Sequence, residues 1–171
     1  MMKSKENIVF LGMMGSGKTS LGSLISKKLN LDFYDTDDLI EKKIGMKISK
    51  IFKEKGEPFF RKIEEKTSLE ILKKNNVVIA LGGGAFLNKK VYEEILENHL
   101  SFWLKWNDKI LIQRIKNSSK RPLASNLSND ELLDLMKKRS KIYSKADFKI
   151  NCNDLTKKQI IDKILGIYEK N

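Results

Sequence analysis

Residues 8–19 read Ile-Val-Phe-Leu-Gly-Met-Met-Gly-Ser-Gly-Lys-Thr. The apolar run 8–11 predicts a buried strand, and residues 12–19 follow the pattern G-x-x-x-x-G-K-[ST]. Apolar residues then recur at helical spacing, at Leu21, Leu24, Ile25 and Leu29. A strand, a glycine-rich turn and a helix in this order predict a phosphate-binding loop. A glycine-rich turn with an incidental lysine would leave the Lys-Thr pair unexplained.

We expect this loop to bind the phosphates of ATP. Its glycines allow several backbone N–H groups to point inward, where the positive end of the helix dipole adds to their field. Lys18 is expected to reach the β- and γ-phosphates, and the Thr19 hydroxyl to ligate Mg²⁺. The predicted nucleotide-binding residues are Gly12, Met13, Met14, Gly15, Ser16, Gly17, Lys18, Thr19 and Ser20.

Length and composition indicate one globular domain. The 171 residues, 40% of them hydrophobic, suffice for a sizeable core. No apolar run has the length of a membrane span, and the N-terminus enters the first strand directly, so we expect no membrane association and a cytoplasmic location. One cysteine, Cys152, and one histidine, His99, exclude an internal disulfide and a Cys/His zinc site.

The formal net charge of +12 raises the question of nucleic-acid binding. The lysines, however, are scattered over almost every predicted helix, and no lysine run exceeds two residues. A polyanion-binding module that uses nucleotide is therefore a remote alternative, because it should show clustered basic stripes. A gel-shift experiment near physiological salt would identify such a module. We expect a lysine-rich solvated surface and no specific nucleic acid.

Arginine is rare among the 34 basic residues. A guanidinium group supplies a planar fork or a stacking surface that an ammonium group cannot. The chain otherwise uses lysine, so we expect at least three of its arginines to line the active site. They are Arg61, Arg114, Arg121 and Arg139.

Strand-like and helical patterns alternate along the chain. This alternation predicts an α/β fold, a parallel sheet with helices on both faces. The predicted strands are 8–11, 32–34, 77–81, 100–104 and 148–150. The predicted helices are 18–29, 37–44, 48–55, 58–74, 88–98, 107–117, 129–145 and 156–169. The polar loop 117–128 lies between two strong helices, and loops of this kind are often lids.

Asp35 and Asp37 flank one residue at the end of the second predicted strand. Ligands of parallel sheets bind at this edge, so one carboxylate could support Mg²⁺ and the other could meet a substrate hydroxyl. Alternatively, one of these acids only caps the next helix. Asp38 or Thr36 could provide that cap, which favours a functional role for the pair.

Residues 56–64 place Arg61 and Glu64 three positions apart on a helix, where the two side chains can meet. Beside two phenylalanines, this arginine resembles a cleft-lining cation oriented by a carboxylate. Phe52 and Phe60 could form a wall for an organic substrate or could belong to the core, and the pattern leaves both open.

Gly82, Gly83 and Gly84 end the third predicted strand and would present bare backbone N–H groups to a ligand, unless they form only a flexible turn. No acidic residue follows this strand directly, so a Walker-B aspartate is missing there. That absence makes Asp35 the better candidate for Mg²⁺.

Taken together, these motifs resemble shikimate kinase over essentially the whole chain. In order they are the glycine loop 12–19, Asp35-x-Asp37, Gly56-Glu57-x-x-Phe60-Arg61-x-x-Glu64, Gly82-Gly83-Gly84, Arg121-Pro122-Leu123 and Arg139-x-x-x-Tyr143. The resemblance implies a P-loop kinase fold with strand order 2-3-1-4-5, a substrate-binding helical region at about 36–64 and a lid. It also implies transfer of the γ-phosphate of ATP to the 3-hydroxyl of shikimate with Mg²⁺.

The resemblance also implies a role for each matching residue. Lys18, Asp37 and Arg121 would be catalytic, with Asp37 at the reacting hydroxyl and Arg121 as the lid arginine. Thr19 and Asp35 would serve the metal. The nucleotide would also contact Arg114, through adenine stacking, and Arg121. Shikimate would be bound by Asp37, Phe60, Arg61, Gly82, Gly83, Gly84 and Arg139.

The sequence departs from the family pattern at two places, and one rival function shares the same phosphate loop. Ala124 stands where the lid often has a second leucine, and 151–154 replaces a variable adenine loop. The rival is another small-metabolite kinase with the same loop, such as a gluconate kinase, whose substrate also carries a carboxylate and hydroxyls. The combination of Asp37, Arg61 and three glycines favours shikimate. We expect a monomer.

Overall fold

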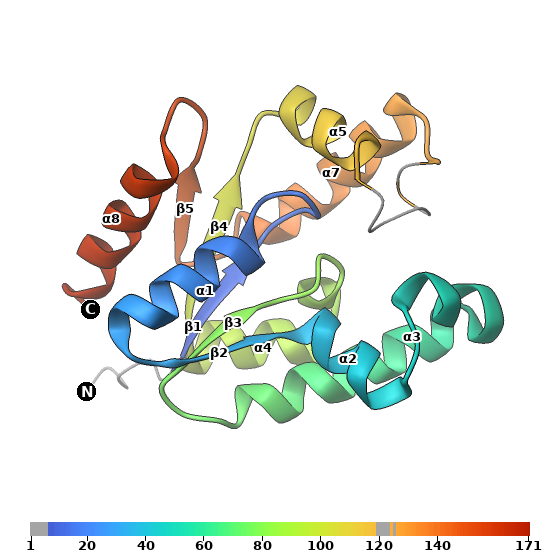
Figure 1. Ribbon diagram of the computed structural model, residues 1–171, viewed down its shortest axis with the longest axis horizontal. Coiled ribbons are helices and arrows are strands. Elements are labelled where there is room, and N and C mark those ends of the chain that lie inside the picture. Colours follow the sequence, from blue (N-terminus) through green and yellow to red (C-terminus); the bar gives the residue numbers. More distant parts are fainter. Residues whose placement is uncertain (1–6, 119–123, 125) are drawn as a thin grey trace.

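The structure is a computed structural model that describes residues 7–118, 124 and 126–171. Its centre is a five-stranded parallel sheet of order β2-β3-β1-β4-β5 (Figure 1). This confirms the predicted fold class and strand order. The strands are β1 Ile8–Leu11, β2 Asp32–Asp35, β3 Val77–Ala80, β4 Leu100–Lys105 and β5 Phe148–Asn151.

Helices cover both faces of the sheet, as predicted (Figure 1). One face packs against α1 (Lys18–Leu29) and α8 (Lys157–Tyr168). The opposite face packs against α3 (Ile48–Leu72), α4 (Lys89–Asn98), α5 (Asp108–Lys116) and α7 (Asn129–Tyr143). The short α2 (Thr36–Ile44) lies beside α3 and forms a third cluster with it. These bounds agree with the predicted ranges to within about two residues, the usual uncertainty of helix ends.

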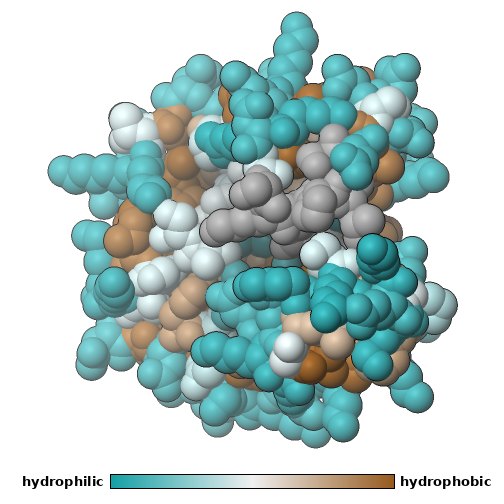
Figure 2. All heavy atoms as spheres, turned by 45° about the vertical axis from the view of Figure 1, so that its right-hand side comes forward, coloured by the Kyte–Doolittle hydropathy of each residue, from teal (hydrophilic) through white to brown (hydrophobic). Residues whose placement is uncertain are grey.

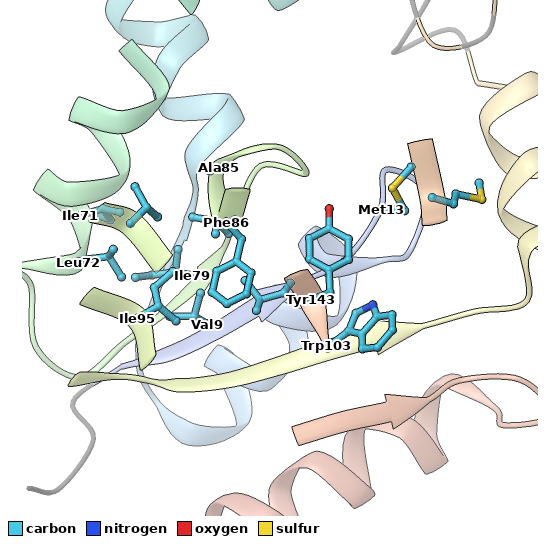
Figure 3. Close-up of a cluster of buried hydrophobic side chains, with 14 of the residues drawn as sticks. Val9, Met13, Ile71, Leu72, Ile79, Ala85, Phe86, Ile95, Trp103 and Tyr143 are labelled. Carbon is cyan, nitrogen blue, oxygen red and sulfur yellow. The ribbon is translucent and has the colours of Figure 1, made fainter. Parts of the chain in front are cut away.

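Alternating side chains of the strands divide the core into two layers. On β1, Phe10 faces α1 and α8, whereas Val9 faces α3 and α4. Every residue of β1 and of β3 is buried, because these strands are covered on both faces. Figure 3 shows the Val9 layer, in which Phe86 and Tyr143 lie side by side.

Two local features complete the path of the chain. Gly56 has φ 81° and ψ 168°, so α3 is two helices joined at a kink, as the break between 55 and 58 predicts. Pro58 sits in the first turn of the second helix, where a missing N–H is tolerated. A 3₁₀ helix, η1 (Ala85–Leu87), was not predicted. The amide of Ala85 donates to the carbonyl of Gly82, so the glycine run turns back on itself, and the amides of Leu87 and Asn88 continue the i to i+3 pattern to Gly84 and Ala85.

Figure 2 shows hydrophilic side chains spread over most of the visible face. Within the described residues, no helix is long and apolar enough to cross a bilayer.

The buried Asn7 side chain connects the start of the sheet to α3. Its amide nitrogen donates to the carbonyls of Leu72 at 3.3 Å and Lys74 at 2.6 Å. Its amide oxygen accepts from the backbone N–H of Val77 at 3.1 Å. One side chain therefore satisfies three backbone groups where α3 ends and β3 begins.

We predict that Asn7→Ala lowers the free energy of unfolding by about 1–3 kcal/mol, because it leaves buried backbone groups unsatisfied. Urea unfolding followed by circular dichroism measures the change. The control is Asn98→Ala, whose amide bonds to Glu94 one turn earlier on α4. It should cost less than about 0.5 kcal/mol. Equal costs for the two variants would contradict this role of Asn7.

Candidate active site

The carboxyl ends of β1, β2 and β3 bring the predicted loops together (Figure 1). A Cβ atom added at Gly83 would lie 3.7 Å from both the carbonyl oxygen of Gly12 and the amide nitrogen of Met14. The phosphate loop after β1 and the glycine run after β3 are therefore so close that a single methyl group would fill the space between them.

The phosphate loop requires glycine for two separate reasons. Gly12, Gly15 and Gly17 have φ values of 146°, 79° and 90°, which residues with a side chain rarely adopt. In addition, a Cβ atom at Gly12 would lie 2.8 Å from the hydroxyl oxygen of Ser16. That hydroxyl is buried and finds no hydrogen-bond partner in the described part of the chain. The loop thus fits an anion that accepts hydrogen bonds.

Lys18 begins α1 and folds back over the loop. Its ammonium group donates to the carbonyls of Gly12 at 2.7 Å and Met13 at 3.0 Å. The charge is therefore held within the loop, at the place where a phosphate chain would lie.

Thr19 and Asp35 form the predicted metal pair. The Thr19 hydroxyl donates to Asp35 Oδ2 at 2.5 Å. Burial is the largest influence on Asp35 and raises the pKa of its carboxyl, and nearby Asp37 and Asp38 raise it further. A bound cation would lower the pKa of Asp35 again, because it would favour the charged carboxylate over the protonated form. No cluster of three His, Cys, Asp or Glu side chains suited to a metal exists among residues 7–118, 124 and 126–171. Two protein oxygens still fit Mg²⁺, which keeps several waters and phosphate oxygens as ligands.

The helix cap at α2 comes from one of the two acids. Asp35 itself is the N-cap, and its Oδ1 accepts from the amides of Asp37 at 2.9 Å and Asp38 at 3.4 Å. This bears out the alternative that one of the two acids caps the helix, and neither Asp38 nor Thr36, which could have served, takes that role, because Asp35 has extended backbone angles and the helix begins at Thr36. Thr36 instead accepts a hydrogen bond from the amide of Gly82 at 2.8 Å.

Asp37 and Glu64 converge on the glycine run. A Cβ atom at Gly82 would lie 2.7 Å from Asp37 Oδ1 and 3.1 Å from Glu64 Oε1. The absent side chain thus leaves room for two carboxylates. Burial is the largest influence on Glu64 and raises its pKa, although Arg61 opposes the rise.

Arg61 lies against the other end of the glycine run. Its Cζ would be 2.9 Å from a Cβ atom at Gly84. It donates to Glu64 at 2.7 Å and to Glu57 at 3.0 and 3.1 Å. Burial favours its neutral form, but the two glutamates outweigh burial and hold the pKa above its usual value. The guanidinium is therefore fixed in orientation at the edge of the site.

The two phenylalanines differ in environment. Phe60 is only 3% exposed and packs with Ile40 and Ile51, so it belongs to the core cluster of α2 and α3. Phe52 is partly buried beside it, with ring centroids 4.6 Å apart. The Arg61 guanidinium carbon lies 5.3 Å from the centroid of Phe60. The ring of Phe60 therefore packs against the guanidinium of Arg61.

Arg139 on α7 is 7% exposed and reaches the middle of the glycine run. A Cβ atom at Gly83 would lie 3.1 Å from its Nη1, which donates to the sulfur of Met13 at 3.8 Å. Its Nε is buried without a hydrogen-bond partner in the described residues. An arginine with an unsatisfied buried donor is a ready binding group for a carboxylate.

Tyr143, one turn after Arg139, was in the motif but received no role from the sequence. Its buried hydroxyl donates to the carbonyl of Gly83. Figure 3 shows its ring between Phe86 and Trp103. α7 is thereby bonded to the same glycine that Arg139 approaches.

Arg114 and Trp106 contact the outer side of the phosphate loop. Arg114 donates to the carbonyl of Gly15 at 3.1 Å, and Trp106 donates to the carbonyl of Ser16 at 2.9 Å. Sequence reasoning missed Trp106. The only available signal was its position directly after a strand whose carboxyl end faces the site.

Arg121 and half of the predicted lid, residues 119–123 and 125, lie outside the described residues. The other three arginines all lie against the two loops, through Gly15, Gly83 and Gly84. Ala124 is buried in the core layer of α7. Cys152 is buried too, and burial raises the pKa of its thiol to about 11, so it is inert as a nucleophile.

Comparison with known proteins agrees with this geometry. The sequence model of the shikimate kinase family matches residues 14–169. The shikimate kinase of Thermodesulfovibrio yellowstonii is 40% identical over 166 residues, which are 96% of each chain. The structure of the shikimate kinase from Acinetobacter baumannii in complex with shikimate superposes with a TM-score of 0.91 at 30% identity, over 99% of this chain and 96% of that one.

More distant structures share only the fold. A gluconokinase from Sinorhizobium meliloti superposes with a TM-score of 0.60 at 14% identity, over 98% of this chain and 94% of that one. That similarity carries no argument about substrate. The family match includes the phosphate loop from Met14 onward, the glycine run and α7, and the chain belongs to the shikimate kinase family.

Proposed function

We propose that this site transfers the γ-phosphate of ATP to the 3-hydroxyl of shikimate, giving shikimate 3-phosphate and ADP. One observation supports the proposal most. The buried guanidinium of Arg139, with an unsatisfied donor, and the carboxylate of Asp37 approach the same glycine run beside a phosphate loop. A substrate with a carboxylate at one end and a hydroxyl at the other fits this arrangement.

On the nucleotide side, the chain contributes positive charge and oriented N–H groups. Lys18 exchanges its loop carbonyls for the β- and γ-phosphates when ATP binds. Thr19 and Asp35 would hold Mg²⁺, which neutralises phosphate charge during transfer. Arg114 lies beside the loop, where adenine would stack on its planar group.

On the acceptor side, Arg61 and Arg139 bind the carboxylate of shikimate. Glu57 and Glu64 hold Arg61, and the surrounding core holds Arg139, so little side-chain freedom is lost on binding. Asp37 then meets the 3-hydroxyl and orients its oxygen toward the γ-phosphate. We propose that the monomer is the active form.

A coupled assay of ADP production tests the proposal. Shikimate should stimulate ATP turnover strongly, whereas gluconate at the same concentration should not. Product analysis by mass spectrometry should show one added phosphate on shikimate. Stimulation by gluconate alone would favour the rival kinase, and stimulation by neither would refute both.

We predict that Asp37→Asn lowers kcat by at least about 10²-fold, because the amide keeps the shape but neither carries the charge nor accepts the proton. The KM values for both substrates should change much less. Steady-state kinetics measure the effect, and circular dichroism verifies the fold. Near-normal turnover in a folded variant would remove Asp37 from the mechanism.

We predict that Arg139→Lys raises the KM for shikimate by about ten- to a hundredfold, because lysine keeps the charge but loses the planar fork. The KM for ATP should change far less. The matched control is the exchange Lys138→Arg at the neighbouring exposed position, which should leave both KM values unchanged. Equal damage to both substrates in Arg139→Lys would point to a nucleotide role or to misfolding.

For Arg121 the proposal rests on the family resemblance. A lid arginine would approach the phosphates as charge moves between them and so stabilise the transition state more than the bound substrate. We predict that Arg121→Ala binds ATP nearly normally but loses most of kcat, since such arginines are worth about 10³- to 10⁵-fold. Nucleotide titration and single-turnover kinetics separate the two quantities. A fully active variant would refute the role.

A further inference from the structure

We propose that Trp106 is a positioning residue for the nucleotide, a role that neither the motifs nor the family match assigns. Its indole N–H sets the orientation of the phosphate loop, and its ring holds Arg114 as a platform for adenine. The proposal rests on the proposed function only in taking this loop and Arg114 as the nucleotide site.

The first part of the argument is the bond to the loop. Trp106 Nε1 donates to the carbonyl oxygen of Ser16 at 2.9 Å, across 90 residues of sequence. The peptide between Ser16 and Gly17 is trans, so the N–H of Gly17 points in the direction opposite to that carbonyl. Trp106 lies outside the loop and holds the carbonyl outward. It thereby turns the N–H of Gly17 toward the phosphate position.

The second part is the stack with Arg114. The guanidinium carbon of Arg114 lies 4.0 Å from the centroid of the Trp106 ring, the spacing of a close cation–π contact. The same guanidinium donates to the carbonyl of Gly15 at 3.1 Å. Two neighbouring loop carbonyls are thus held by two side chains that also stack on each other. The guanidinium carbon lies over tryptophan, and because Arg114 is exposed, we infer that an adenine ring can stack on the side away from the indole.

This arrangement reduces the cost of binding. Arg114 is exposed, and a solvated arginine loses considerable side-chain entropy when it is immobilised on a ligand. Stacking on Trp106 restricts the side chain before the nucleotide arrives. The neighbouring Asn107 extends the arrangement, because its backbone N–H donates to Asn153 Oδ1 at 2.8 Å and so connects the 151–154 loop to the same turn.

The rival interpretation is that Trp106 only fills space, since it packs against both core layers. Two variants and two probes separate the roles. Trp106→Phe keeps an aromatic face but loses the donor, and Trp106→Leu loses both. Inorganic pyrophosphate reports on the phosphate loop alone, and ADP adds the adenine stack. Calorimetry on the full chain measures both affinities, and kinetics give the KM for shikimate.

We expect Trp106→Phe to weaken pyrophosphate and ADP by a similar factor, about three- to tenfold, from the lost hydrogen bond. Trp106→Leu should weaken pyrophosphate by the same factor and ADP by a further two- to fivefold or so, from the lost platform. The KM for shikimate should change by less than about twofold in both, a difference a merely structural residue would not produce. Unchanged ADP affinity, or equal losses for ADP, pyrophosphate and shikimate, would overturn the proposal.

A second measurement leaves Trp106 intact. The chain has two tryptophans, so Trp103→Phe makes Trp106 the only tryptophan, whose emission can be excited selectively over that of the tyrosines. The same exchange serves as the matched control, since the Trp103 ring packs against Tyr143 and should not change ADP affinity by more than about twofold. The fluorescence of Trp106 in the Trp103→Phe variant should respond to ADP and pyrophosphate but not to shikimate alone. No response to ADP would overturn the proposal. Shikimate-dependent turnover of the wild-type chain tests the proposed function separately, because nucleotide binding does not depend on which alcohol is phosphorylated.

Discussion

The pairing of β1 with β3 is the interaction on which the site depends. At the carboxyl end of the pair, the amide of Leu81 donates to the carbonyl of Phe10 at 3.1 Å, and both strands then continue as glycine loops. The register of β1 against β3 therefore fixes how the two loops lie beside each other. A shift of one residue would move every buried side chain of β1 or β3 to the other face, so the core layers on both sides oppose it.

The arginines show why the total charge of the chain is a poor guide to its function. Most lysines are solvated, and their ion pairs, such as Lys89 with Glu93, contribute little. Arg139 is almost fully buried, and Arg61 is held by Glu64, whose own carboxyl is buried. Removing charge from water is costly unless a partner compensates for it. The protein places these buried charges at the glycine run, where a charged ligand can compensate for their lost hydration.

Much of the fold could be predicted from the sequence, because local signals determine it. The apolar run before Gly12 indicated the first strand, and the break at Gly56 and Pro58 indicated the kink in α3. The site was harder to predict from the sequence. Tyr143 and Trp106 act through carbonyls 60 and 90 residues away, and no spacing in the sequence reports such partners. The helix cap was left open for a similar reason, since any of the four residues 35–38 could have supplied it and only backbone geometry decides among them.

Asp35 explains how the two sides of the site keep a fixed distance. One oxygen of its carboxylate caps α2 through the amide of Asp37, and the other accepts the Thr19 hydroxyl from α1. The same group thus fixes the backbone of the residue proposed to meet the acceptor and the residue proposed to meet the metal. A cation drawn to the Thr19 side would leave the cap in place, because each oxygen already has a separate task. The Asp35 carboxylate therefore links the start of α2 to the start of α1 directly behind the phosphate loop, so the groups proposed for nucleotide and acceptor are positioned by one side chain before either ligand binds.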